Sequence, residues 1–267
     1  MSQEVAVYGC GGFGRGIAWL AQMCGAQVVC FIDDDEATQG KLINAIPAVT
    51  LTEARRRFPD ARVAVAVNDP RTRETLASRA EGVGFSLATL LHPRVELSPW
   101  VQVGQGSIVR EGCCFSVNVE LGRNVLLNMD CTIGHDVVVG DFASLAPGSH
   151  VSGFVHLGRR AHVGTGAVIL QGQQGAPLVI GDDAMIGAGA CVTKSVLPGE
   201  TVVGVPARPI GWTRHGDTET RRRVVAVTRR RGVALTRRSG DTLTQGGGLE
   251  MGRRPVREES SERNHVS

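Results

Sequence analysis

The sequence of 267 residues has few aromatic side chains and no long apolar run. Phe, Trp and Tyr make up 4% of the residues, whereas 35 residues are Gly. Such a composition is typical of tight, repeated turns rather than of a bulky mixed core. No apolar segment reaches the roughly 20 residues of a membrane-spanning helix. The start, "MSQEVAVYGCGGFG", has no basic segment before an apolar one, so we expect neither a membrane span nor secretion.

The cysteines do not indicate a disulfide framework. There are seven, an odd number, and none of them forms a CxxC pair. Cys113 and Cys114 are adjacent and cannot form an ordinary bridge. We therefore expect reduced thiols and a cytoplasmic protein.

The net charge of +3 comes from the end of the chain. Residues 213–267 hold 13 Arg, no Lys and 7 acidic residues, so the part before them is mildly acidic. The segment has no sustained period and few apolar residues, which predicts a mostly disordered, Arg-rich tail. No aromatics that could stack on bases lie between the arginines, which argues against nucleic acid as a partner.

The first third of the chain alternates between two patterns. Strand-like segments are expected at residues 4–9, 27–35 and 61–69, and helical segments at 9–25, 50–59 and 70–84. Thr52 is the expected N-cap of the second helix, and Pro70 suits the start of the third. Strands that alternate with helices predict a small parallel α/β sheet, a Rossmann-like half-domain over residues 1–95.

From about residue 100 an apolar residue recurs at every sixth position, often followed by Gly. A period of six fits neither a helix nor a long strand, but it is typical of a parallel β-helix, which we place at residues 96–212. The phase is lost over residues 171–178, which predicts a loop at one corner of the helix. That loop is either part of a binding face or a tolerated surface insertion. The apolar positions are 103, 109, 115, 121, 127, 133, 139, 145, 151, 157, 163 and 169, then 180, 186 and 192.

The segment "GCGGFG", from Gly9 to Gly14, follows a strand and opens a helix. This is the context of a phosphate-binding glycine turn. "FIDDD" closes the next strand about 20 residues later, where a dinucleotide fold keeps its ribose-binding acid. The residues alone allow either NAD or another nucleotide.

The hexads and the glycine turn together resemble a known family. The segments "VYGCGGFGR", "FIDDD", "LLHPRVELSP", "LNMDCTIGHDVVVGDFASLAPGSHVSG" and "IGDDAMIGAGACVTKSVLPGETVVGVPARPI" are similar to sugar acyltransferases of the sialic acid O-acetyltransferase and bacillosamine-pathway type. The resemblance covers roughly residues 4–210. It implies a Rossmann-like domain joined to a left-handed β-helix, acetyl-CoA as co-substrate, and a homotrimer with each active site between two subunits.

His135 and Asp136 are candidates for acid–base chemistry. Ile133 should point inward, so that both side chains lie near the surface. An imidazole can take a proton from an attacking amine or hydroxyl, and a neighbouring carboxylate can fix its tautomer. On spacing alone, two solvated polar residues in a loop are the better interpretation. The resemblance implies that His135 is the general base, with Asp136 as its orienting partner and Asn128 as a residue that places the histidine or the substrate.

The resemblance also implies binding residues. The backbone N–H of Gly153 would bind the thioester carbonyl, and coenzyme A would lie near Gly153, Thr165 and Ala188, with Lys194 and Arg208 as partners for its phosphates. The nucleotide of a UDP-sugar would contact Gly12, Phe13, Gly14, Asp33, Asp34 and Asn68. Three positions depart from the family pattern: Phe13 and Ser144 replace histidines, and Val67 replaces a glycine.

A metal site is not expected. His150, His156 and His162 are six residues apart, but successive hexads lie on different faces of a β-helix, so the three rings should not converge.

The expected activity is acetyl transfer from acetyl-CoA to the amino group of a UDP-linked 4-amino-deoxysugar, in one ternary complex. One alternative is O-acetylation of sialic acid or another surface sugar. The alternative from another class is a non-catalytic scaffold that binds sugar nucleotides.

Overall fold

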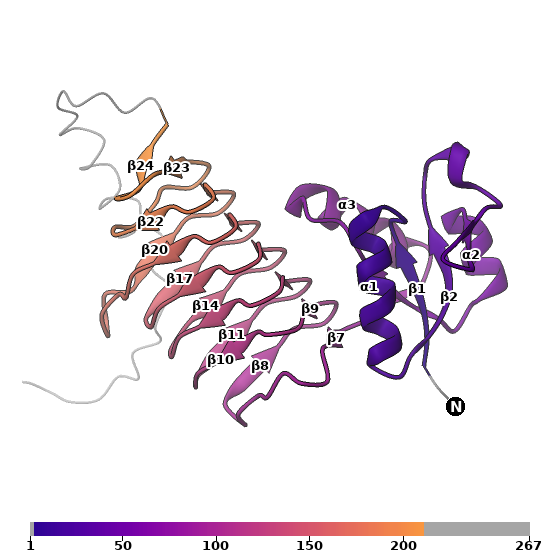
Figure 1. The fold of residues 1–267 in the computed structure, drawn as a ribbon, viewed down its shortest axis with the longest axis horizontal. Helices are drawn as coiled ribbons and strands as arrows, with labels where there is room; N and C mark the ends of the chain where they lie inside the picture. Colours follow the sequence, from indigo (N-terminus) through magenta and orange to yellow (C-terminus); the bar gives the residue numbers. More distant parts are fainter. Residues whose placement is uncertain (1–2, 211–267) are drawn as a thin grey trace, which may run out of the picture. The chain divides into compact units, whose positions relative to one another are not determined.

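A computed structural model describes residues 3–210 of the chain, which lie within one compact unit. It contains an N-terminal α/β domain followed by a left-handed parallel β-helix, as the sequence predicts (Figure 1). The predicted Arg-rich tail at 213–267 lies outside the described residues. No helix within residues 3–210 is long and apolar enough to cross a membrane.

The N-terminal domain is built on a six-stranded sheet in the order β3-β4-β2-β1-β5-β6. The sheet is parallel except for the pairing of β3 with β4, a hairpin that the sequence analysis did not predict. A 3₁₀ turn, Glu36–Thr38, precedes that hairpin. The strands are β1 (Glu4–Tyr8), β2 (Gln27–Ile32), β3 (Leu42–Ile43), β4 (Ile46–Val49), β5 (Arg62–Val65) and β6 (Ser86–Leu87).

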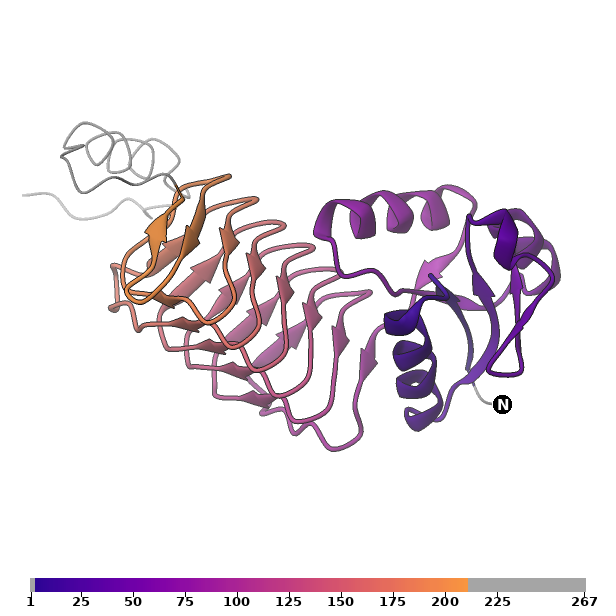
Figure 2. The same ribbon diagram turned by 45° about the horizontal axis from the view of Figure 1, so that its top comes forward.

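The helices cover opposite faces of this sheet (Figure 2). Helix α1 (Gly12–Met23) packs on the face that carries Val5 and Val7, and the same cluster includes Ile108 and Leu126 of the β-helix. Helices α2 (Leu51–Arg57) and α3 (Pro70–Gly82) pack on the face that carries Tyr8. Because neighbouring strand residues point to opposite faces, β1 contributes to both cores.

The two later helices begin with side-chain caps. Asp69 accepts a hydrogen bond from the Thr72 N–H, directly before Pro70, as expected for a helix that starts with proline. The predicted cap Thr52 was wrong, because α2 starts earlier. Thr50 caps it by accepting from the Glu53 N–H, and Thr52 lies within the first turn.

The β-helix has three sheets, one for each face of its coils. One contains β7 (Leu90–Leu91), β9 (Ile108–Val109), β12 (Leu126–Leu127), β15 (Ser144–Leu145), β18 (His162–Val163), β21 (Met185–Ile186), β23 (Thr201–Val203) and β24 (Arg208–Pro209). We call it the β7–β24 sheet. The β8–β20 sheet contains β8 (Val101–Val103), β11 (Val119–Leu121), β14 (Val138–Val139), β17 (Val155–Leu157) and β20 (Leu178–Ile180). The β10–β22 sheet contains β10 (Cys114–Phe115), β13 (Thr132–Ile133), β16 (His150–Val151), β19 (Val168–Ile169) and β22 (Cys191–Val192).

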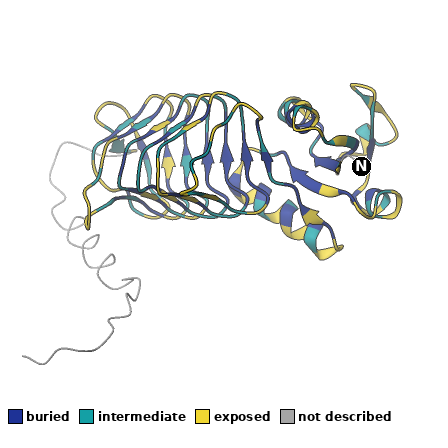
Figure 3. Cartoon of the chain, turned by 90° about the horizontal axis from the view of Figure 1, so that it is seen from below, coloured by how far each residue is buried: buried dark blue, intermediate teal, exposed yellow. Residues whose placement is uncertain are grey.

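Each coil is three hexads long. Leu127 pairs with Leu145, and Ile133 pairs with Val151, so corresponding residues are 18 apart. The inward aliphatic residues form one continuous core that runs through the coils (Figure 3). The glycines that follow them allow the coils to stack: a Cβ on Gly140 would lie 2.7 Å from the Arg159 nitrogen of the next coil.

The break in the hexad phase is a loop, as predicted. Val155 pairs with Leu178, a spacing of 23 rather than 18, so one coil carries five extra residues. Gly172 donates to the Gly153 carbonyl and Leu178 donates to the Phe154 carbonyl, which holds both ends of the loop against the preceding coil.

The three evenly spaced histidines lie on three different sheets. His150 is in β16, His156 in β17 and His162 in β18, so their rings do not converge, as expected from the hexad geometry. Within residues 3–210 no group of three His, Cys, Asp or Glu side chains is placed to hold a metal ion.

Candidate active site

His135 and Asp136 form a hydrogen-bonded pair at a corner of the β-helix. The His135 Nδ1 lies 2.8 Å from the Asp136 Oδ2, and the two side chains are 40% and 37% exposed. Asp136 adopts a positive φ of 56°, which turns the chain so that adjacent side chains can meet. Its other oxygen accepts from Asn118 Nδ2 at 3.1 Å. The hydrogen bonds from His135 and then Asn118 lower the pKa of Asp136, so the carboxylate is charged near neutral pH.

Gly153 lies directly against the His135 ring from the next coil. A Cβ at this position would be 2.5 Å from the imidazole, so a side chain here would displace His135. Phe154 packs its ring edge-on against the imidazole, with centroids 4.9 Å apart. Within residues 3–210 the Gly153 N–H has no hydrogen-bond partner. The corner thus combines a held imidazole with an unpaired backbone donor.

Asn128 lies at a different corner. Its Oδ1 accepts from Arg110 Nη1 at 3.1 Å and from the Met129 N–H at 3.0 Å, and the residue is 7% exposed. It makes no hydrogen bond to His135 within this chain. Arg110 also pairs with Glu111, at 3.0 Å from its Nη2.

Four of the five predicted cofactor residues fall at these same two corners, and Arg208 does not. The first, which we call the His135 corner, joins the β10–β22 sheet to the β8–β20 sheet and carries His135, Gly153 and Lys194 on stacked coils. The second, the Asn128 corner, joins the β7–β24 sheet to the β10–β22 sheet and carries Asn128, Thr165 and Ala188. The face of the β10–β22 sheet therefore separates the two sets in one chain.

The remaining phosphate candidates lie late in the coils. Lys194 is exposed. Arg208, in β24, is partly buried and donates to the Ala207 carbonyl at 2.8 Å.

The glycine turn has the close packing that the motif requires. A Cβ on Gly14 would lie 1.8 Å from the Gly9 carbonyl oxygen, so only glycine fits where α1 crosses the turn. Gly9 itself has a φ of 103°, which favours glycine. Gly12 and Phe13 form the first turn of α1, with Gly12 exposed and Phe13 partly buried.

The two predicted acids behave differently. Asp33 accepts from the Cys10 N–H and the Asp35 N–H, and closes the glycine turn. Burial alone would raise the pKa of Asp33, but these hydrogen bonds lower it. Asp34 pairs with Arg79 at 2.6 Å and accepts from the Tyr8 hydroxyl. Burial, together with Asp34, raises the pKa of Tyr8 to about 12.

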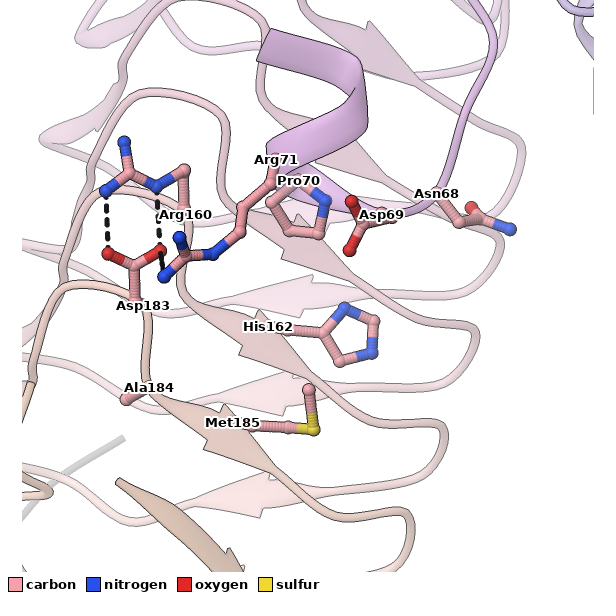
Figure 4. A pocket seen from close by; sticks show the side chains of 9 residues that line it. All are labelled: Asn68, Asp69, Pro70, Arg71, Arg160, His162, Asp183, Ala184 and Met185. Atoms are coloured by element: carbon pink, nitrogen blue, oxygen red, sulfur yellow. Dashed lines mark hydrogen bonds and ion pairs between the residues drawn. The ribbon is translucent and has the colours of Figure 1, made fainter. Parts of the chain in front are cut away.

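Asn68 lies beside a cavity of about 330 Å³ between the β5–α3 turn and the β-helix (Figure 4). His162 and Met185 line it from β18 and β21, and Arg160 pairs with Asp183 on its wall at 2.6 Å. Burial and the nearby Arg73 lower the pKa of His162, which favours the neutral ring. The cavity lies on the β7–β24 sheet, so it is on another face from the His135 corner.

Ser144, which replaces a family histidine, holds this turn in place. It is 2% exposed and donates to the Asn68 carbonyl at 3.0 Å. Arg73 of α3 also holds this turn against the coils, and the residue is 1% exposed. Its guanidinium donates to five backbone carbonyls, those of Val67, Asn68, Asn124, Phe142 and Ala143. The β5–α3 turn is therefore held to the coils by buried hydrogen bonds.

Sequence reasoning missed Asn118 and Arg110, although a signal for both was present. Asn118 is 18 residues before Asp136, and Arg110 is 18 before Asn128. Since one coil spans 18 residues, each pair is stacked on neighbouring coils. Subtracting one coil length of 18 residues from the candidates Asp136 and Asn128 identifies these two contacts. Arg73 lies in an ordinary amphipathic helix, and no comparable signal marks it.

Comparison with known proteins places the chain among characterised relatives. Residues 4–80 match the family model described as PglD N-terminal domain. The chain is 33% identical, over 76% of its length and 94% of the relative, to GDP-perosamine N-acetyltransferase of Escherichia coli O157:H7. It is similar to the structure of PerB from Caulobacter crescentus in complex with CoA and GDP-perosamine, with a TM-score of 0.70 and 30% identity over 77% of this chain and 96% of that one. The acetyltransferase domain of PglB from Neisseria gonorrhoeae in complex with acetyl coenzyme A gives 0.70 and 32%, over 78% and 100%.

The coils, the His135 corner and these relatives together define a hexapeptide-repeat acyltransferase. More particularly, the chain belongs to the family of sugar N-acetyltransferases that carry a PglD-type N-terminal domain. The predictions of the family, of an acetyltransferase and of acetyl-CoA as its co-substrate are confirmed.

Proposed function

We propose that this enzyme transfers the acetyl group of acetyl-CoA to the amino group of a nucleotide-linked amino sugar, with His135 as general base. The observation that carries the proposal is the hydrogen-bonded His135–Asp136 pair packed against Gly153.

The pair suits the removal of one proton. With a proton on Nδ1, His135 donates to the charged Asp136, and its Nε2 is left to accept a proton from the attacking amine. The amine nitrogen bonds to the thioester carbon and the carbon–sulfur bond then breaks. The proton passes from the imidazolium to the leaving thiolate, so no acyl-enzyme is needed.

Backbone donors would stabilise the oxyanion that forms on the thioester oxygen. The Gly153 N–H is unpaired within residues 3–210 and lies beside the imidazole. The N–H groups of Thr165 and Ala188 are also unpaired within that range, so they can bind the amide carbonyls of coenzyme A. Lys194 and Arg208 are the proposed partners for its phosphates. A backbone N–H that binds the oxyanion contributes about 3 kcal/mol to transition-state stabilisation in comparable enzymes.

The division of these residues between two corners supports a homotrimer. In one chain the β10–β22 face separates Gly153 from Thr165 and Ala188. If the His135 corner of one subunit faces the Asn128 corner of the next, all three donors line one groove. The active site is then complete only between subunits.

The nucleotide site is proposed at the glycine turn, with contacts from Gly12, Phe13, Gly14, Asp33, Asp34 and Asn68. Arg79 pairs with Asp34, and backbone N–H groups donate to Asp33. Because both carboxylates already have partners, the N-terminus of α1 is available to bind the diphosphate. The relatives from Escherichia coli and Caulobacter crescentus favour GDP-perosamine as the acceptor, whereas the sequence resemblance favoured a UDP-sugar.

The test is release of the coenzyme A thiol with purified protein. GDP-perosamine, a UDP-4-amino-deoxysugar and sialic acid are compared as acceptors. We expect turnover with an amino sugar nucleotide, and a loss of at least about 100-fold in kcat for His135→Ala. Asp136→Asn retains the shape and tolerates the positive φ, so it should lower kcat without changing the melting temperature.

Equal rates in wild type and His135→Ala would remove His135 as the base. Tight binding of a sugar nucleotide without turnover of any acceptor would instead indicate the non-catalytic binding protein.

A further inference from the structure

Arg110 is a partly buried cation that the proposed chemistry does not use. It follows β9 on the coil directly before Asn128, and its side chain is 13% exposed. Its Nη1 donates to Asn128 Oδ1 and its Nη2 to Glu111, while its Nε is buried without a partner in the described chain. A buried donor without a hydrogen-bond partner destabilises the fold. We therefore look for a function of this guanidinium that offsets the free-energy cost.

The Arg110–Asn128 contact fixes which way the Asn128 amide faces. The amide oxygen accepts from Arg110 and from the Met129 N–H, and a cation cannot accept a hydrogen bond from the amide nitrogen. The Nδ2 group is thereby turned away from Arg110, and it makes no hydrogen bond within residues 3–210. Asn128 is left with a free, oriented donor.

The same guanidinium faces the N-terminal domain. Its Nη2 lies 3.8 Å from the position that a Cβ on Gly16 would occupy, so it points at α1 two residues after the glycine motif. Helix α1 also shares a core with β9 and β12 (Figure 1). Arg110 therefore lies between the helix that opens the proposed nucleotide site and the amide of Asn128.

We propose that Arg110 is a positioning residue for acetyl transfer: it orients the Asn128 amide as a hydrogen-bond donor to the reacting groups and registers it against α1. This inference rests on the proposed role of Asn128 in catalysis. Arg110 itself does not touch the substrate.

A double-mutant cycle tests the proposal. The variants are Arg110→Met, Asn128→Ala and the double variant, with Arg62→Met, an exposed arginine of β5, as a matched control. We expect Arg110→Met to lower kcat about 10- to 100-fold, the usual effect of losing a hydrogen bond from a charged group. The KM values should stay near those of wild type, and the double variant should be no slower than Asn128→Ala.

Two further variants separate orientation from folding. Arg110→Lys keeps the charge but loses the planar fork, so it should recover part of the rate. Asn128→Asp keeps an acceptor for Arg110 but lacks the N–H donor, so it should be as slow as Asn128→Ala. If Arg110→Met does not fold, the cycle is run with Arg110→Lys.

The outcomes are distinct. If Asn128→Ala turns over at the wild-type rate, the proposed role of Asn128 fails. If Asn128→Ala is slow but the Arg110 variant has the wild-type kcat, the positioning role of Arg110 is overturned. The same holds if the double variant is slower than Asn128→Ala by the factor that the Arg110 variant shows alone.

Discussion

Gly153 links a packing requirement to the proposed catalysis. Its φ does not demand glycine, but a Cβ at this position would lie 2.5 Å from two atoms of the His135 ring and 2.9 Å from a third. The reason for glycine at this position is therefore the neighbouring imidazole and not the turn. The proposed base and its oxyanion donor depend on the same close contact.

Gly153→Ala should accordingly have a larger effect on kcat than on the free energy of unfolding. The added methyl group displaces the His135 ring, and a small misplacement of a catalytic group has a large effect on rate. We expect a loss of at least about tenfold in kcat, measured by thiol release. Gly82→Ala is the control, since a Cβ there meets nothing within 4 Å. A kcat equal to that of the control would contradict the role of this contact.

At the scale of the elements, the coil of 18 residues places the site. It stacks Gly153 on His135, Asn118 under Asp136 and Arg110 under Asn128. The five-residue insertion lies on the next coil, because Gly172 and Leu178 at its two ends donate to the carbonyls of Gly153 and Phe154. The loop thus emerges at the His135 corner, and this placement favours a binding role over a tolerated insertion.

Deleting residues 173–177 restores the spacing of 18 and tests that role. We expect the coils to remain folded, with the free energy of unfolding changed by less than about 1 kcal/mol, because loop length has a weak effect on stability. The KM for acetyl-CoA should rise several-fold, since the loop borders the proposed groove. Unchanged KM values for both substrates would support the tolerated insertion instead.

At the scale of the whole described unit, buried and charged contacts fasten α3 to the coils. Arg73 donates to five carbonyls from the β5–α3 turn and two coil turns, and burial lowers its pKa to about 10. Glu74 pairs with Arg159 and Arg160, and Asp183 pairs with Arg160 and Arg71. These contacts fix the Asn68 turn relative to the β-helix.

Arg73→Met should destabilise the protein by about 3 kcal/mol or more, because several buried carbonyls lose their donor at once. Chemical denaturation measures the change, with the exposed Arg56→Met as control. In a folded Arg73→Lys variant, the KM for the nucleotide sugar should rise while that for acetyl-CoA does not. A stability equal to that of the control would contradict the role of Arg73.

The ion pairs predict an acid dependence of stability. The hydrogen bond from Arg160 lowers the pKa of Asp183 below its unfolded value of about 4. A lowered carboxyl pKa stabilises the fold above that value, and this contribution is lost as the pH falls through the folded pKa. Asp183→Asn should therefore melt at a lower temperature than wild type at pH 7, and the gap should shrink as the pH falls below the unfolded pKa of about 4. A gap that does not change with pH would exclude this ion pair as the cause.

The sequence by itself determined the periodic parts of this protein. Hexads such as those at Ile133 and Val151 define coils because an inward aliphatic residue every six positions has one packing solution. The glycine turn before α1 could also be predicted from the sequence, since glycine at position 14 is required by a contact with the nearby Gly9. Local periodicity carries that information because the residues involved interact with near neighbours or at a fixed spacing.

Only the tertiary structure decided which side chains meet. Strands β3 and β4 are too short for a periodic signal, and the cap at Thr50 depended on where α2 starts. The burial of Arg73 among carbonyls and the pairing of Asp34 with Arg79 follow from long-range packing. Contacts between residues far apart in the chain depend on how the domain and the coils pack together, which no local pattern records.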